Sequence, residues 1–224
     1  MKIQAVIFDL DGTLLDTIED LQVSMNEVLR REGYPALDRE AVRRGIGNGA
    51  REFIKCSLPA GTEVSEQELD RLLDVYSGIY GAGGFPNTRP FEGIPEVLDR
   101  LGQTGVKRAV LSNKTHSNTQ AVIEKYFGRD RFDVVMGKRA EFAPKPDPAS
   151  LNAVIAQLGV PRESVLFTGD GDADYLLTVN AGVAYAGALW GYRTEAELRS
   201  LGADRFCRTP RELLELVLAA NAEG

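Results

Sequence analysis

The 224 residues of this chain allow one large domain or two small ones, and a content of 43% hydrophobic and 26% charged residues is that of an ordinary globular protein. A net charge of -7 at pH 7 argues against binding to nucleic acid or to an anionic membrane surface, because both partners require a basic face. No apolar run approaches the roughly 18 residues that a membrane span needs, and the N-terminus enters a predicted strand directly, which leaves no room for a signal peptide.

The two cysteines, Cys56 and Cys207, lie far apart in the chain and fit no metal-binding spacing. A reduced, cytoplasmic setting is therefore the default expectation. We expect the protein to be a monomer or a homodimer.

A short apolar run at residues 5–8 predicts a buried parallel strand. It leads into Asp9 and Asp11, followed by Gly12 and Thr13. Because side chains alternate along a strand, the two carboxylates leave its end pointing the same way. Carboxylates this close repel, and their pKa values would be raised unless a cation lay between them. Since Asp and Gly are common in turns, an ordinary strand-to-loop junction is the alternative for this motif taken alone.

Residues 17–85 are predicted to be entirely helical. Helices are expected from Thr17 to about Arg31, from about Asp38 to Gly45, after Gly49, and from Glu66 to Ile79. The glycine-rich loop at residues 45–49 lets backbone N–H groups approach a ligand, but on its own it is weak evidence for phosphate binding.

From Phe91 onward, strands and helices alternate. Strands are predicted at residues 106–111, 134–136, 165–168 and 183–186, and helices at residues 95–102, 115–127, 148–158, 175–181 and 210–220. This alternation predicts an α/β fold with a doubly wound parallel sheet. The first strand precedes the helical block and its partners follow it. Residues 1–16 and 86–224 are therefore expected to form the core domain, with residues 17–85 inserted as a helical domain.

Polar residues end three of the predicted strands. Asp9 and Asp11 follow the first, Ser112 and Asn113 end the second, and Asp170 follows a later one. In open α/β sheets ligands bind beyond the carboxyl ends of the strands. Convergence of such groups from separate strands indicates a functional site more strongly than any single motif.

These motifs together resemble those of the haloacid dehalogenase superfamily of phosphohydrolases. The resemblance rests on DLDGTLLDT at residues 9–17, Ser112-Asn113-Lys114, KPDP at residues 145–148, and Gly169-Asp170 with Asp174. Their order and spacing cover nearly the whole chain, and the most similar subgroup is phosphoglycolate phosphatase-like. The resemblance implies a Rossmann-like core carrying an inserted helical cap.

The resemblance also implies a role for each motif residue. Asp9 would attack phosphorus to form an aspartyl-phosphate, and Asp11 would protonate the leaving oxygen and later accept a proton from water. Ser112 would hydrogen-bond a phosphoryl oxygen, and Lys145 would neutralise the nucleophile and the phosphoryl group. Further substrate contacts are expected from Gly12, Thr13, Asn113, Asn48 and Arg51. An all-oxygen Mg²⁺ site is expected from Asp9, Asp11, Asp170 and Asp174.

The motifs do not decide the role of some other residues. Gly171 stands where the family usually has Ser, and Asp172 adds an acid without an assigned role. His116, the only histidine, is expected at the surface. The stretch Trp190-Gly191-Tyr192 is similar to one in phosphoglycolate phosphatase-like members, although packing against the core would also explain it.

The expected activity is Mg²⁺-dependent hydrolysis of a small phosphate monoester, with 2-phosphoglycolate the leading candidate. Arg43, Arg44 and Arg51 flank the glycine-rich loop and could pair with a substrate carboxylate, although exposed charges of this kind are often only solvated. The alternatives are a sugar phosphomutase of the β-phosphoglucomutase type and a phosphatase for pyrophosphate, sugar phosphates or nucleotides. Two further alternatives are a signalling receiver domain, which is shorter and lacks the helical insertion, and a catalytically silent binding protein.

Overall fold

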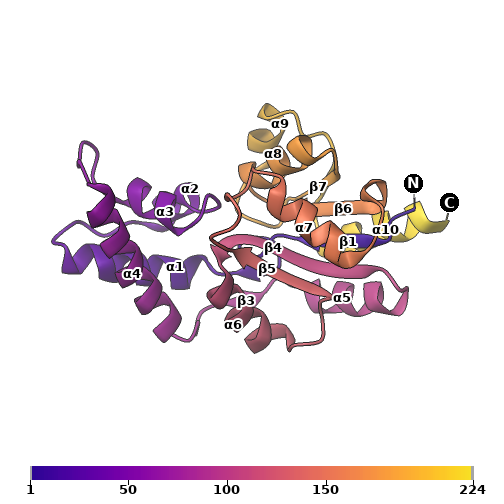
Figure 1. The fold of residues 1–224 in the computed structure, drawn as a ribbon, viewed down its shortest axis with the longest axis horizontal. Coiled ribbons are helices and arrows are strands. Elements are labelled where there is room, and N and C mark those ends of the chain that lie inside the picture. The colour runs from indigo at the N-terminus through magenta and orange to yellow at the C-terminus, as the bar shows by residue number, and fades with distance from the viewer. Residues whose placement is uncertain (1, 223–224) are drawn as a thin grey trace. The chain divides into compact units, whose positions relative to one another are not determined.

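The computed structural model describes residues 2–222, and the chain divides into two compact units (Figure 1). The core unit combines Met1–Asp16 with Pro90–Gly224, and the helical unit is Thr17–Arg89. Among the described residues, no helix is long and apolar enough to cross a membrane.

A six-stranded parallel sheet forms the centre of the core unit, in the order β5-β4-β1-β6-β7-β8. The strands are β1 (Ala5–Phe8), β4 (Lys107–Thr115), β5 (Val134–Lys138), β6 (Val165–Gly169), β7 (Ala184–Ala188) and β8 (Phe206–Cys207). The first strand of the chain lies at the centre, where Ile7 is in register with Ala109 of β4 and Phe167 of β6. The predicted α/β class with a parallel sheet is confirmed.

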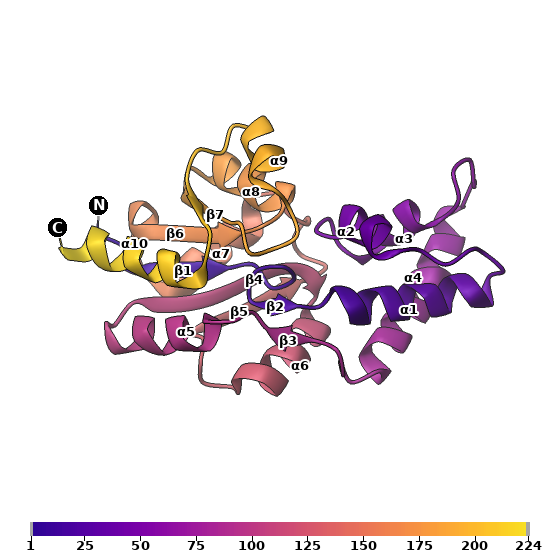
Figure 2. The same ribbon diagram turned by 180° about the vertical axis from the view of Figure 1, so that it is seen from behind.

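Helices cover both faces of the sheet, as Figures 1 and 2 show. One face carries α5 (Ile94–Gln103) and α6 (His116–Phe127), and the other carries α7 (Ala149–Leu158) and α8 (Asp172–Ala181). The chain continues through α9 (Glu195–Ser200) to α10 (Pro210–Ala222), which packs against α5; the short 3-10 helix η1 (Arg162–Ser164) precedes β6. Neither α9 nor β8 is predicted by the sequence pattern.

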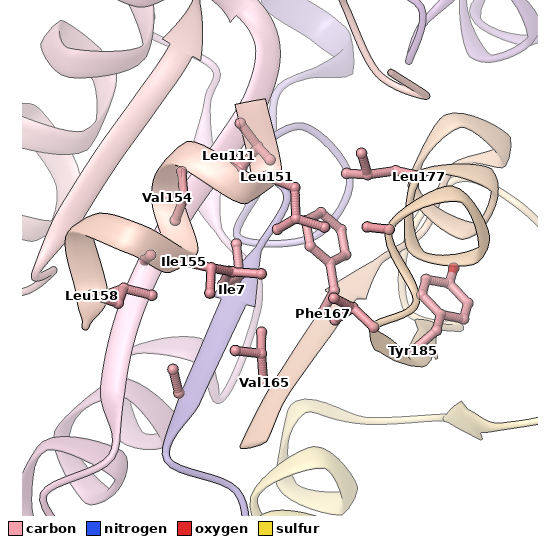
Figure 3. Packing of buried hydrophobic residues seen from close by; sticks show 14 of the residues in the cluster. Ile7, Leu111, Leu151, Val154, Ile155, Leu158, Val165, Phe167, Leu177 and Tyr185 are labelled. Atoms are coloured by element: carbon pink, nitrogen blue, oxygen red, sulfur yellow. The ribbon is translucent and has the colours of Figure 1, made fainter. Parts of the chain in front are cut away.

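The face under α7 and α8 forms a continuous apolar cluster (Figure 3). Ile7 and Phe167 on the strands meet Leu151 of α7 and Leu177 of α8, and all four are 0% exposed. Burial on both faces explains why β1 is an uninterrupted apolar run rather than an alternating one. This packing holds the carboxyl ends of β1, β4 and β6 in one place.

The helical unit consists of α1 (Ile18–Arg31), α2 (Arg39–Gly45), α3 (Ala50–Ser57) and α4 (Glu66–Ala82). Two helix starts have side-chain caps, because Asp38 accepts from the Ala41 N–H and Ser65 from the Glu68 N–H. The face that α4 buries is aromatic and apolar, with buried Leu69, Leu72, Tyr76 and Tyr80. The chain leaves the core through β2 (Leu15–Asp16) and returns through β3 (Arg89–Pro90), which pair as a two-stranded sheet.

Candidate active site

The site is built from the carboxyl ends of three neighbouring strands. Asp9 follows β1, Ser112 and Asn113 lie near the end of β4, and Asp170 follows β6. The backbone N–H of Asp9 donates to the Thr168 carbonyl at 2.9 Å, which continues the pairing of β1 with β6 past the end of the strand. Convergence of these residues follows from the strand order, with β1 between β4 and β6.

Lys145 lies among the acids. Its ammonium donates to Asp9 Oδ1 at 2.7 Å and to Asp174 Oδ1 at 2.6 Å, and the residue is only 4% exposed. Its backbone is held by Asn113, whose Oδ1 accepts the Lys145 N–H at 2.8 Å and whose Nδ2 donates to the Lys145 carbonyl at 3.2 Å. Asn113, expected to contact substrate, thus also positions Lys145.

Burial and the neighbouring charges of Asp9, Asp174 and Lys145 shift the pKa values of Asp9 and Lys145. Burial, and the charge of Asp174 next, raise the pKa of Asp9 well above its ordinary value, while Lys145 acts in the opposite direction. Burial alone would lower the pKa of the Lys145 ammonium, but the charges of Asp174 and Asp9 and its hydrogen bonds to them raise it above the usual value. The site therefore favours a cationic lysine beside an acid that is costly to ionise.

Asp170 is fixed by one hydrogen bond to each carboxylate oxygen. The Thr13 hydroxyl donates to Oδ1 at 3.1 Å, and the Tyr192 N–H donates to Oδ2 at 2.8 Å. Burial and then the charge of Asp174 raise the pKa of Asp170 to about 7, although both hydrogen bonds lower it. Thr13 thus contacts a candidate metal ligand, and the substrate contact expected from it remains a prediction.

The donor set fits a hard divalent cation such as Mg²⁺. Asp9, Asp170 and Asp174 each offer a carboxylate oxygen, these oxygens lie within 4.8 Å of one another, and all three residues are buried. When all three carboxylates are ionised, the single ammonium leaves two negative charges uncompensated, which a divalent ion would balance. Oxygen-only ligands favour Mg²⁺ over zinc. Within residues 2–222 this acidic group does not include the side chain of Asp11.

Asp11 and Ser112 lie beside this group and are linked through Lys114. The Lys114 ammonium pairs with Asp11 Oδ1 at 3.1 Å, and the Ser112 hydroxyl accepts the Lys114 backbone N–H at 3.2 Å. Ser112 is 4% exposed. The assignments of Asp11 as proton donor and as metal ligand, and of Ser112 as a phosphate contact, remain predictions.

The loop after β7 contributes contacts that the sequence motifs do not reveal. The indole N–H of Trp190 donates to the Thr13 carbonyl at 2.9 Å. Between Trp190 and Tyr192, a Cβ at Gly191 would overlap the Gly12 carbonyl oxygen and the Asp170 side chain. The only sequence signal was the similarity of this stretch to one in phosphoglycolate phosphatase-like members.

The residues proposed from the helical unit have partners inside that unit. Arg51 pairs with Asp70 at 2.6 Å and with Glu66 at 2.7 Å. Both Arg43 and Arg44 pair with Glu40. Asn48 lies in the loop between α2 and α3. The substrate contacts expected from Asn48 and Arg51 remain predictions.

His116 begins α6 and is partly buried. Its Nδ1 accepts the Gly137 N–H at 3.2 Å, and burial, together with nearby Arg139, lowers its pKa. The surface position expected for this residue is therefore only partly observed.

The family model described as haloacid dehalogenase-like hydrolase matches residues 6–188. The chain is 31% identical over 219 residues to a phosphoglycolate phosphatase from Vibrio parahaemolyticus, covering 96% of each sequence. It is also 30% identical to an N-acetylmuramic acid 6-phosphate phosphatase from Pseudomonas aeruginosa, covering 97% of this chain and 96% of that protein.

Solved structures show the same fold. A structure from Lactobacillus delbrueckii subsp. bulgaricus superimposes with a TM-score of 0.89 at 29% identity, covering 97% of this chain and 99% of the other. A haloacid dehalogenase-like family hydrolase from Streptococcus pneumoniae gives a TM-score of 0.83 at 23% identity, covering 96% and 98%. With its acidic cluster at the carboxyl end of a parallel sheet and its inserted helices, the chain belongs to the haloacid dehalogenase-like hydrolase family.

Proposed function

We propose that this protein is a Mg²⁺-dependent phosphatase that hydrolyses a small phosphate monoester through an aspartyl-phosphate. The observation that carries the proposal is the group formed by Asp9, Asp170, Asp174 and Lys145, in which a buried ammonium touches the nucleophile candidate. Phosphoryl transfer depends mainly on positioning and charge stabilisation, and this group offers both.

In the first step, an Asp9 carboxylate oxygen bonds to phosphorus and the bond from phosphorus to the ester oxygen breaks. The leaving oxygen takes the proton of Asp11 and departs as an alcohol. Lys145 holds Asp9 in place at 2.7 Å and adds positive charge beside the phosphoryl oxygens. Ser112 donates a hydrogen bond from its hydroxyl to one of those oxygens.

In the second step, water attacks the phosphorus of the aspartyl-phosphate and gives its proton to Asp11. The bond between Asp9 and phosphorus breaks, which releases inorganic phosphate and restores both carboxyl groups to their starting states. Asp9, Asp170 and Asp174 would hold the Mg²⁺, which when bound supplies charge neutralisation for the transferring group. Thr13 and Tyr192 keep Asp170 oriented for that purpose.

The substrate class that we propose is a phosphate monoester bearing a carboxylate, with 2-phosphoglycolate as the first candidate. The names of two similar proteins describe phosphorylated carboxylic acids, one of glycolate and one of N-acetylmuramic acid. N-acetylmuramic acid 6-phosphate is accordingly the second candidate. The three arginines first considered for the carboxylate already have acidic partners in the helical unit, which weakens their candidacy.

The experiment is a release assay for inorganic phosphate with and without Mg²⁺. Its substrates are 2-phosphoglycolate, N-acetylmuramic acid 6-phosphate, glucose 6-phosphate, pyrophosphate and a nucleotide. We expect the two carboxylated esters to be hydrolysed most efficiently, and chelation to abolish turnover. Ca²⁺ should inhibit, because the larger ion takes more ligands in a looser geometry. Full activity after exhaustive chelation would refute the role of the metal, and isomerisation of a sugar phosphate without phosphate release would favour a mutase.

A further inference from the structure

A second lysine lies beside the proposed proton donor, and neither the motif roles nor the proposed mechanism uses it. Lys114 comes from the same strand end as Ser112 and Asn113, and its Nζ lies 3.1 Å from Asp11 Oδ1. Its side chain is only 7% exposed, compared with 18% for that of Asp11. A lysine buried to this extent is held close to anions, because an ammonium removed from water without one is costly.

The backbone of Lys114 is fixed on both sides of the residue. Its N–H donates to the Ser112 hydroxyl, and its carbonyl accepts from the Thr119 hydroxyl at 3.2 Å. Across the strand pair, β5 presents Gly137, where any Cβ would overlap the Lys114 carbonyl. Gly137 of the neighbouring strand thus leaves room for the Lys114 carbonyl, and the Lys114 side chain extends from a backbone held by hydrogen bonds on both sides.

Lys114 and Lys145 lie on different parts of the site. Lys145 contacts Asp9 and Asp174, the residues on the phosphoryl and metal side. Lys114 contacts Asp11, which in the proposed mechanism faces the ester oxygen that leaves. A substituent on the carbon bonded to that oxygen therefore comes within reach of the Lys114 ammonium.

We infer that Lys114 is a specificity-determining residue that binds an anionic group on the leaving alcohol. The inference rests on the proposed function and narrows its substrate class to esters whose carboxylate is attached to the ester carbon, as in 2-phosphoglycolate. In N-acetylmuramic acid 6-phosphate the carboxylate is on a different part of the sugar, so Lys114 favours the first candidate over the second. A neutral leaving group offers the ammonium no opposite charge, so the Coulomb attraction to a carboxylate is lost.

The test compares 2-phosphoglycolate with its neutral amide, glycolamide phosphate, which has nearly the same shape. Wild-type protein should show a higher kcat/KM for the carboxylate. Lys114→Met should lower kcat/KM for 2-phosphoglycolate by about ten- to a hundredfold, the usual effect of losing a hydrogen bond to a charged group. The same substitution should lower kcat/KM for the amide by a clearly smaller factor, because the amide carbonyl accepts from the ammonium but carries no full negative charge. Lys114→Arg should restore part of the preference, and the exposed Lys125→Met is the matched control.

The outcomes separate this role from a purely structural one. Equal losses on both substrates would mean that Lys114 only orients Asp11, and equal kcat/KM values in the wild type would also overturn the inference. Failure of the wild type to hydrolyse any ester would overturn the proposed function itself. If Lys114→Met does not fold, Lys114→Gln is compared in the same way. Binding of both ligands to Asp9→Asn, with and without Lys114→Met, gives a readout that needs no turnover.

Discussion

At the level of single residues, Lys145 holds together two carboxylates that would otherwise repel each other. Its ammonium lies 2.7 Å from Asp9 and 2.6 Å from Asp174, and its side chain is only 2% exposed. Removing one partner of a buried ion pair leaves uncompensated charge, which typically costs about 3–5 kcal/mol. We expect Lys145→Met to lower the free energy of unfolding by about that amount in chelator at pH 8. Urea denaturation of the wild type and the variant measures this difference in the free energy of unfolding.

The control for this experiment is Lys125→Met, which removes an exposed lysine and should change stability by less than about 0.5 kcal/mol. Added Mg²⁺ should recover part of the loss in Lys145→Met, because the ion supplies positive charge to the same carboxylates. A destabilisation below about 1 kcal/mol would contradict the assigned charge balance.

Asp9→Asn should abolish turnover while leaving the fold intact. The amide cannot attack phosphorus, and the substitution removes one of three clustered carboxylates whose ionisation is disfavoured by burial. Stability without metal should stay equal or rise. The measurements are steady-state phosphate release and circular dichroism. Residual activity above about a tenth of the wild-type rate, in a preparation free of contaminating phosphatase, would end the nucleophile assignment.

The raised pKa of Asp170 predicts how stability depends on pH. Its pKa is about 7 in the folded protein against an ordinary value of 3.8, so the folded state holds this proton more tightly than the unfolded state does. The stabilisation that Asp170 contributes to the folded state is fully present below about pH 4 and is lost as the pH rises through 7. At about 1.4 kcal/mol per pH unit, the loss reaches at most about 4 kcal/mol.

The measurement is urea denaturation of metal-free protein at intervals from pH 4 to 8. Asp170→Asn should flatten the profile, and Mg²⁺ should remove much of the loss at the alkaline end. A metal-free stability that increases steadily from pH 5 to 8 would contradict the prediction.

At the level of elements, the loop after β7 fixes the nucleophile loop. Gly191 lies so close to the Gly12 carbonyl and to Asp170 that a methyl group does not fit. Gly191→Ala should therefore push these two segments apart. Because the placement of catalytic groups is sensitive to small displacements, the Mg²⁺ concentration needed for half-maximal activity should rise by at least about tenfold. Stabilisation of the fold by Mg²⁺ should weaken as well. Mg²⁺-dependent shifts in the melting temperature provide a readout independent of turnover.

The matched control is Gly78→Ala in α4, where an added Cβ meets nothing within 4 Å. Alanine there should leave the Mg²⁺ dependence unchanged and stabilise α4 by about 0.5–1 kcal/mol. Equal Mg²⁺ responses in the two variants would show that the close contact at Gly191 has no influence on the site.

Elements with a continuous apolar run or a helical period were predictable from the sequence, and the shortest ones were not. The continuous apolar runs of β1 and β6 identify buried strands, and α5 is long enough for its amphipathic pattern to show a helical period. In contrast, β8 has only two residues, Phe206 and Cys207, so no period exists to read. The Trp190–Thr13 and Lys114–Asp11 contacts join segments that are distant in the chain, and only the folded sheet brings them together.

At the level of the whole molecule, the apolar cluster under α7 and α8 draws all its residues from the core unit. The paired strands β2 and β3 also bring together the two points where the helical unit joins the core. We therefore expect the core to fold when residues 17–89 are replaced by a short Gly-Ser linker. Such a variant should unfold cooperatively and be stabilised by Mg²⁺.

Calorimetry and circular dichroism with and without Mg²⁺ test this expectation, with the full chain as the control. A variant that lacks a cooperative transition would show that the core depends on the inserted helices. A cooperative transition that does not respond to Mg²⁺ would show that the acidic group needs more than the core unit.

The central position of β1 also has a consequence for synthesis of the protein. This strand is translated before both of its neighbours, β4 and β6, which emerge from the ribosome only after residues 107 and 165. Until then, a strongly apolar segment has two unpaired edges, which is a hazard for association with other chains. The nascent chain is therefore expected to depend on chaperones until Gly169 has left the exit tunnel, and ribosome-bound chains stopped before β6 should be the ones that aggregate on release.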